Sequence, residues 1–133
     1  MSITKAQVFE QAAQQKLWAG HLIAADYLST DTLDNHTPIN NSLIGQIASG
    51  TSGDVDSAVQ VARDSFENGT WRRLAPAERK AIMQRWCALM HEHSEELAAL
   101  DCVDAGKPIT ECLNTDIPAT IETFEWYSEA ADK

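Results

Sequence analysis

Apolar residues recur at helical spacing between residues 51 and 69. Five of them fall on one face of a helix: Val55, Ala58, Val59, Ala62 and Phe66. Thr51 or Ser52 can cap the start of this helix, and Asp54 lies where the helix dipole favours a negative charge. Asn68 and Gly69 are residues that commonly end a helix. The pattern therefore predicts one amphipathic helix over this stretch.

A longer apolar stripe follows Pro76, a residue that suits the first position of a helix. Its members are Ile82, Met83, Trp86, Leu89, Met90, Leu97 and Leu100. Gly106 and Pro108 are expected to end this helix, because glycine favours a C-terminal cap and proline cannot continue the ladder. The sequence thus predicts one long helix across the stripe.

Two further helical segments are expected beyond Pro108. The first is short and ends at about Asn114, and the second restarts at Asp116. Ile121, Phe124 and Ser128 would share one face of this last helix.

The first fifty residues have a different character. Thr4 to Trp18 is predicted to be a helix, because Thr4 and Gln7 have the spacing of a capping box and apolar residues recur after them. From His21 to Gly50, short apolar runs alternate with turn-forming residues, which predicts two or three short strands paired as hairpins. Pro38 cannot donate to a strand ladder, so it belongs at a sheet edge or strand end.

The elements together predict a mostly α fold with a small β-hairpin. No run has the β-branched, buried character of central parallel strands, so a complete doubly wound domain is not expected. The predicted organisation is a single incomplete domain over residues 1–133. It consists of an N-terminal helix (1–20), a β-hairpin region (21–50) and a helical layer (51–133).

The charge balance excludes several classes of partner. Twenty acidic against ten basic residues give a formal net charge of −10, which repels nucleic-acid backbones and anionic membranes. No apolar run approaches the roughly 20 residues that span a bilayer, and the N-terminus lacks an apolar signal-peptide core. Three scattered cysteines fit reduced thiols better than a disulfide framework. We therefore expect a cytoplasmic protein without nucleic-acid or membrane partners.

Few side chains have the spacing of a catalytic or metal site. Cys87 and His91 are one helical turn apart and could face one ligand, but two donors are too few for a structural zinc ion. His93 falls on the apolar stripe, which favours a core or interface histidine. Nothing in the sequence activates Cys87, Cys102 or Cys112, so inert thiols are expected. The acidic residues are interpreted as solvated helix surface.

Gly45, Gly50 and Gly53 are also unlike a phosphate-binding loop. Their spacing matches neither the dinucleotide fingerprint nor the P-loop. They are interpreted as turn residues around a strand and the start of the following helix.

Several short sequence elements follow one another in a fixed order between Ile44 and Lys133. They include Ile44-Gly45-Gln46-Ile47-Ala48, Leu74-x-Pro76-Ala77-Glu78-Arg79, Asp104-x-Gly106-Lys107-Pro108, Asp116-Ile117-Pro118 and Trp126-Tyr127-x-Glu129-Ala130-x-Asp132-Lys133. This series resembles the N-terminal segment of the NAD(P)-dependent aldehyde dehydrogenase superfamily, and the first forty residues match it only loosely. The last two elements are most similar to the branch that oxidises γ-glutamyl-γ-aminobutyraldehyde and related aminoaldehydes.

The resemblance implies a parent enzyme that oxidises an aldehyde to a carboxylic acid with NAD or NADP. The family's nucleophilic Cys, its Glu base, its oxyanion-hole Asn and its cofactor-binding residues belong to segments that would follow Lys133. No catalytic or cofactor-binding residue is therefore carried onto this chain, and neither cofactor is expected to bind it alone. The resemblance implies the N-terminal part of an aldehyde dehydrogenase-like α/β fold, without the complete nucleotide-binding sheet.

One site is implied by the resemblance. Many family members hold a monovalent cation between the Asp of the Asp-x-Gly-Lys-Pro element and backbone near an Asn-Pro turn. The matching positions here are Asp104 and about His36, with Thr37-Pro38 in place of Asn-Pro. A second departure is Ala75, where a Ser or Thr helix cap is usual, and the loss of that cap costs about 1 kcal/mol.

Three interpretations stay open at this point. The chain could be a non-catalytic scaffold segment whose partner is the remainder of a dehydrogenase. It could be a stand-alone interaction module that self-associates through exposed apolar helix faces. It could also be an acidic helical domain of unrelated function.

Overall fold

The computed structural model describes residues 4, 6–8, 10, 21–23, 26–28, 31–130 and 133. The chain divides into two compact units. One comprises residues 1–15, 37–42 and 75–133, and the other comprises residues 16–36 and 43–74. The prediction of one incomplete domain stays a prediction. Most of the predicted N-terminal helix lies outside the described residues, but Thr4 and Gln7 form the expected capping box, with Thr4 N donating to Gln7 Oε1 over 2.8 Å.

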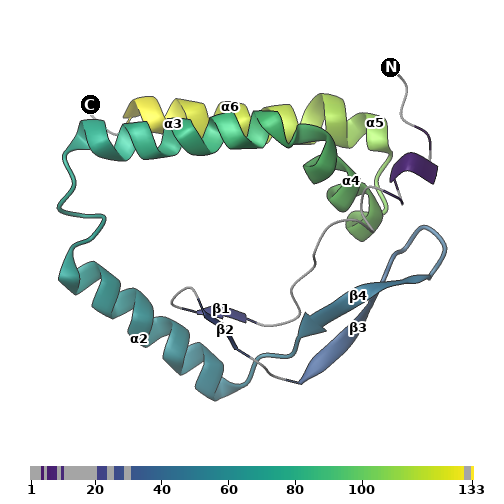
Figure 1. The fold of residues 1–133 in the computed structure, drawn as a ribbon, viewed down its shortest axis with the longest axis horizontal. Helices are drawn as coiled ribbons and strands as arrows, with labels where there is room; N and C mark the ends of the chain where they lie inside the picture. Colours follow the sequence, from purple (N-terminus) through teal and green to yellow (C-terminus); the bar gives the residue numbers. More distant parts are fainter. Residues whose placement is uncertain are drawn as a thin grey trace. The chain divides into compact units, whose positions relative to one another are not determined.

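The strands of the second unit form two antiparallel hairpins (Figure 1). β1 (His21–Ile23) pairs with β2 (Asp26–Leu28), and β3 (Thr32–His36) pairs with β4 (Leu43–Ala48). The expectation of two or three strands was therefore wrong, because the first apolar run holds two separate strands of three residues each. Such short strands lack the length from which alternation can be read.

The residues between β3 and β4 form the predicted turn. Asn41 has φ of 60°, and its N–H donates to Thr37 O over 2.8 Å. Ser42 O accepts from Thr37 N over 3.0 Å, which closes the turn. Pro38 stands just past the end of β3, so its prediction as a strand-end residue is confirmed.

The helix α2 (Ser52–Asn68) has the predicted ends. Thr51 and Asp54 form a reciprocal capping box, and Gly69 adopts the left-handed conformation that ends the helix, with φ of 77°. No residue of α2 is buried. Its apolar stripe is instead exposed, with Val55 60%, Val59 64% and Phe66 53% accessible.

The predicted long helix is two helices in the structure, α3 (Pro76–Glu92) and α4 (Ser94–Ala105). The break lies at His93, whose φ of −103° and ψ of 21° leave the helical region. This break could not be predicted from the sequence, because apolar residues continue at helical spacing on both sides of it and no Gly or Pro lies at the junction. α4 ends at Gly106 as predicted, in the left-handed conformation.

The last two predicted segments are joined. α5 (Ile109–Glu111), the π-helical segment η1 (Cys112–Asp116) and α6 (Ile117–Ala130) follow without a break. The last helix therefore begins at Ile117, next to the predicted restart at Asp116, but no gap separates it from the preceding segment. Pro118 lacks an N–H and would crowd the carbonyl one turn earlier, and the wider π turn before it accommodates that defect.

The core of the first unit lies where α3 and α6 run side by side and where α4 meets η1 (Figure 1). Ile121 and Ser128 of α6 are buried on the predicted face, and Phe124 is half-buried. The buried residues of α4 and η1 are small: Ala98, Ala99, Cys102, Val103 and Cys112. Small side chains let the backbones of these helices approach closely.

The helices outnumber the short strands, and the strands form hairpins. The predicted fold class, mostly α with a small β-hairpin, is thereby confirmed.

Candidate functional site

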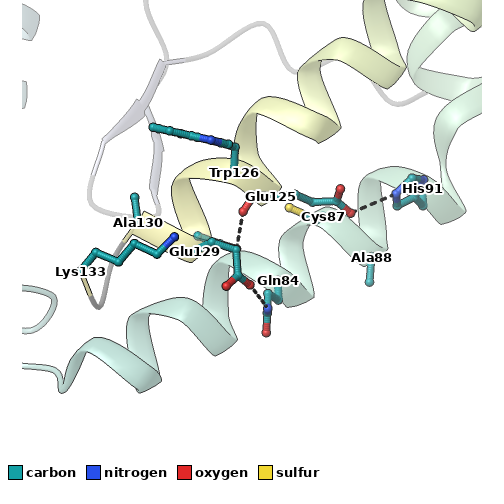
Figure 2. Close-up of a pocket in the computed structure, with 10 residues that line it drawn as sticks. Gln84, Cys87, Ala88, His91, Glu125, Trp126, Glu129, Ala130 and Lys133 are labelled. Atoms are coloured by element: carbon teal, nitrogen blue, oxygen red, sulfur yellow. Dashed lines mark hydrogen bonds and ion pairs between the residues drawn. The ribbon is translucent and has the colours of Figure 1, made fainter.

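A pocket of about 770 Å³ lies between α3 and α6 (Figure 2). Gln84, Cys87 and His91 line it from α3, because residues three and four apart share a helix face. Glu125 and Glu129 line it from α6 for the same reason. The two helices run antiparallel, because Lys80 pairs with Glu129 whereas the later residue His91 pairs with the earlier residue Glu125.

Two polar pairs lie across α3 and α6 beside the pocket. At one end Lys80 Nζ lies 2.6 Å from Glu129 Oε2, and Gln84 Nε2 donates to Glu129 Oε1 over 3.2 Å. The ammonium of Lys80 is the main reason that the pKa of Glu129 is lowered. At the other end His91 Nε2 lies 3.5 Å from Glu125 Oε1. The sequence did not indicate these cross-helix partners, since they are more than thirty residues away.

The thiol of Cys87 lies between these pairs and is buried. Burial raises its pKa, and the nearby charge of Glu125 raises it further. Cys102 also has a raised pKa, mainly through burial. Both thiols stay protonated at neutral pH, which agrees with the interpretation of unactivated cysteines.

A second polar cluster joins α4 to η1. Asp101, Cys112 and Asp116 offer donor atoms that all lie within 4.8 Å of one another. The Cys112 thiol is fully buried, and burial together with its hydrogen bond to Asp101 raises its pKa to about 11. Lys107 forms an ion pair with Asp116, which raises the pKa of the lysine. Each carboxylate thus already has a partner, so the cluster is a structural network. The sequence missed it because the π turn sets which side chains of η1 meet α4.

The two residues predicted to hold a monovalent cation lie in different units. His36 is exposed at the end of β3, and Asp104 is exposed near the end of α4. Their pairing therefore stays a prediction. His93, expected in a core or an interface, is exposed here, and its Nδ1 lies 2.8 Å from Glu96 Oε2, so the core alternative was wrong.

The described residues do not fit a dinucleotide cofactor. Their strands form antiparallel hairpins, whereas the dinucleotide fold places phosphate at the carboxyl edge of a parallel sheet. Gly45 lies inside β4 opposite Asn35, not in the expected turn, and Gly53 lies in the first turn of α2. The carboxylate of Asp54 already caps α2 and would repel a phosphate there.

A profile of the aldehyde dehydrogenase family matches residues 27–133. The chain belongs to the aldehyde dehydrogenase family. Aminoacetaldehyde dehydrogenase of Pseudomonas aeruginosa is 45% identical over 102 residues, which cover 77% of this chain and 21% of that protein. NADP/NAD-dependent aldehyde dehydrogenase of Escherichia coli is 42% identical over 103 residues, with the same coverage of both chains. This chain therefore spans about a fifth of the length of these relatives.

Solved aldehyde dehydrogenases share the fold of this segment. The γ-glutamyl-γ-aminobutyraldehyde dehydrogenase of Burkholderia cenocepacia matches with a TM-score of 0.91 and 36% identity, over 98% of this chain and 27% of that chain. The indole-3-acetaldehyde dehydrogenase of Pseudomonas syringae, solved in complex with NAD+, gives the same values. The resemblance to the family and its aminoaldehyde branch is thereby confirmed. No helix among the described residues is long and apolar enough to cross a membrane.

Proposed function

We propose that this chain is a non-catalytic scaffold segment of an aldehyde dehydrogenase. The observation that carries the proposal is the match over nearly all of this chain to only 27% of a solved dehydrogenase. The remaining three quarters of such an enzyme would then supply the nucleophile, the base and the cofactor site. The parent reaction is the oxidation of an aldehyde to a carboxylic acid with NAD or NADP, at a cytoplasmic location.

The proposed partner is the remainder of the dehydrogenase polypeptide. The helices support this choice because they expose large apolar side chains that a longer chain would cover, and water-exposed apolar area is unfavourable. On α3 these are Ile82, Trp86 and Leu89, which are 41%, 51% and 49% accessible. On α6 they are Trp126 and Tyr127, which are 66% and 58% accessible.

An aminoaldehyde is the proposed substrate class of the parent. Its support is the name of the relative from Pseudomonas aeruginosa and that of the solved enzyme from Burkholderia cenocepacia. The pocket between α3 and α6 is not proposed to hold this aldehyde, because its thiol is protonated and the described residues do not fit the cofactor.

Two measurements test the scaffold proposal. Purified chain, incubated with NAD or NADP and an aminoaldehyde, is expected to form no reduced cofactor, while the Pseudomonas aeruginosa enzyme does so under the same conditions. Turnover by the purified chain would refute the proposal. An antibody against this segment should detect a native protein far larger than 14.6 kDa, with the recombinant chain as the size marker. A native band at 14.6 kDa would reject the scaffold role.

The second candidate is a stand-alone module that self-associates through the same exposed apolar faces. Light scattering would distinguish it, because a stable dimer or larger oligomer is expected under this alternative. Trp86→Glu should then shift the mass toward the monomer. Trp126→Glu, on the exposed face of α6, should do the same. A monomer at all concentrations would exclude the alternative.

The cation site is proposed separately, from family resemblance. Asp104 would supply a carboxylate and the backbone near His36 a carbonyl, ligand types that suit alkali cations. Thermal unfolding of wild type and Asp104→Asn in potassium, sodium and a large organic cation tests this. The proposal fails if the wild-type midpoint does not depend on the cation.

A further inference from the structure

The pocket between α3 and α6 brings together three side chains that bind metals. Cys87 and His91 lie one turn apart on α3, and Glu125 reaches in from α6 (Figure 2). The sequence offered only the first two donors. The third comes from the antiparallel packing of α3 and α6, which places Glu125 Oε1 3.5 Å from His91 Nε2.

We propose that Cys87, His91 and Glu125 bind one divalent cation of the zinc class. Thiolate, imidazole and carboxylate are the protein ligands that zinc takes, and zinc displaces the proton of the Cys87 thiol to solvent as it binds. Two such ligands with bonds of about 2.1 Å at a tetrahedral angle lie roughly 3.4 Å apart, close to the observed separation of His91 and Glu125. The pocket volume of about 770 Å³ leaves room for water in a fourth position.

Binding by these three residues requires rotation of their side chains. Among the described residues, three donor atoms already lie within 4.8 Å of one another only at Asp101, Cys112 and Asp116. In the α3–α6 pocket the side chains of His91 and Glu125 are 62% and 52% accessible, so both can turn toward the thiol. Residues one turn apart on a helix share a face, so Cys87 and His91 can approach one ion.

The neighbouring groups favour these three ligands over others. Glu129 is already engaged by Lys80 and Gln84, so Glu125 is the pocket carboxylate left for an ion. The cluster of Asp101, Cys112 and Asp116 is a poorer site, because the ammonium of Lys107 already neutralises Asp116. A bound ion would link α3 to α6 and stabilise their packing. This inference does not depend on the proposed dehydrogenase role.

Metal titration of the full 133-residue chain, untagged, reduced and stripped of metal, tests the site. Calorimetry is expected to show one zinc ion per chain, and cobalt should give the charge-transfer absorption of a cobalt–thiolate bond. Zinc should also raise the unfolding temperature, because it binds the folded chain. Cys87→Ser should remove the absorption. His91→Ala and Glu125→Gln should each lower zinc affinity about tenfold or more. Loss of a residue that only hydrogen-bonds to a metal ligand already costs about tenfold, and loss of a ligand itself should cost at least as much.

Cys102→Ser and Cys112→Ser are the matched controls, since both thiols are buried in the same unit, and both variants should keep the absorption. Circular dichroism checks that each variant is folded, and Glu125→Gln serves if Cys87→Ser unfolds, because it leaves the thiol in place. The proposal is overturned if wild type binds no zinc, or if the absorption survives Cys87→Ser. Loss of the absorption only in Cys112→Ser would also overturn it, by placing the ion at the other cluster.

Discussion

Gly106 lies directly against the ring of Pro38. A Cβ built on Gly106 would lie 2.7 Å from Pro38 Cγ, which is closer than real Cβ atoms approach. Gly106 also has φ of 73°, a conformation that costs other residues roughly 1–2 kcal/mol. The contact joins the end of α4 to the turn after β3, within one compact unit.

Gly106→Ala is therefore expected to lower the free energy of unfolding by about 2 kcal/mol, since the backbone cost adds to the contact with Pro38. Urea unfolding measured by circular dichroism checks this. Gly53→Ala is the matched control, because the nearest atom to its added Cβ is Thr51 Oγ1 at 3.7 Å. That variant should lose no stability and gain up to about 1 kcal/mol, because alanine favours a helix. Equal losses in both variants would contradict the prediction.

A serine at position 75 should stabilise α3. Glu78 already reaches back to accept from Ala75 N over 2.8 Å, but Ala75 has no side-chain oxygen to complete the capping box. Ala75→Ser is expected to raise the free energy of unfolding by about 1 kcal/mol. Thr51→Ala, which removes a complete box on α2, should lower it by a similar amount. Urea unfolding of both variants measures the two effects, and an unchanged Ala75→Ser would argue against a serine cap.

The ion pair of Lys80 with Glu129 should make stability depend on acidic pH. The pKa of Glu129 is lowered from its ordinary 4.5, chiefly by its hydrogen bond with Lys80. The folded chain therefore binds this proton less tightly than the unfolded chain. The contribution is present above pH 4.5 and is lost as pH falls through the lowered pKa.

Glu129→Gln removes this dependence. The difference in urea midpoint between wild type and Glu129→Gln should be largest at neutral pH and should shrink toward zero under acid conditions. Glu122→Gln, an exposed glutamate on the same helix, is the control and should change the midpoint less. A difference that stays constant from neutral to acid pH would mean that the pair does not lower the pKa of Glu129.

The buried thiol of Cys112 should reduce stability at alkaline pH. Burial and the hydrogen bond to Asp101 raise its pKa from 9.0 to about 11, so the folded chain holds this proton more tightly than the unfolded chain. The contribution is complete below pH 9 and is lost as pH rises toward 11. Cys112→Ser keeps a hydroxyl donor for Asp101 but does not titrate in this range.

Urea midpoints between pH 8 and pH 11 provide the measurement, in a range set by the raised pKa. Wild type should lose stability more steeply than Cys112→Ser. Cys87 titrates in both proteins, so its effect cancels in the comparison. Parallel curves for the two proteins would show that ionisation of Cys112 is not coupled to folding.

Local signals in the sequence predicted the helix ends well. The caps at Thr51 and Gly69, and the stop at Gly106, depend on one or two residues and their own backbone, so a short window contains the cause. The break at His93 and the π turn before Pro118 were missed. The apolar residues continue across the break at His93, and the π turn spans only five residues, too few for a change of period to be read from the sequence.

The sequence by itself determined the family, the mostly α fold and the apolar faces of the helices, because each depends on residue order along the chain. Only the tertiary structure decided which side chains meet across the helices. Glu125 faces His91, Glu129 binds Lys80, and Asp101 binds Cys112. Such pairs depend on the crossing and register of packed helices, which many side chains set together. No local window contains that information, so the candidate metal ligands became visible only when α3 and α6 were seen packed.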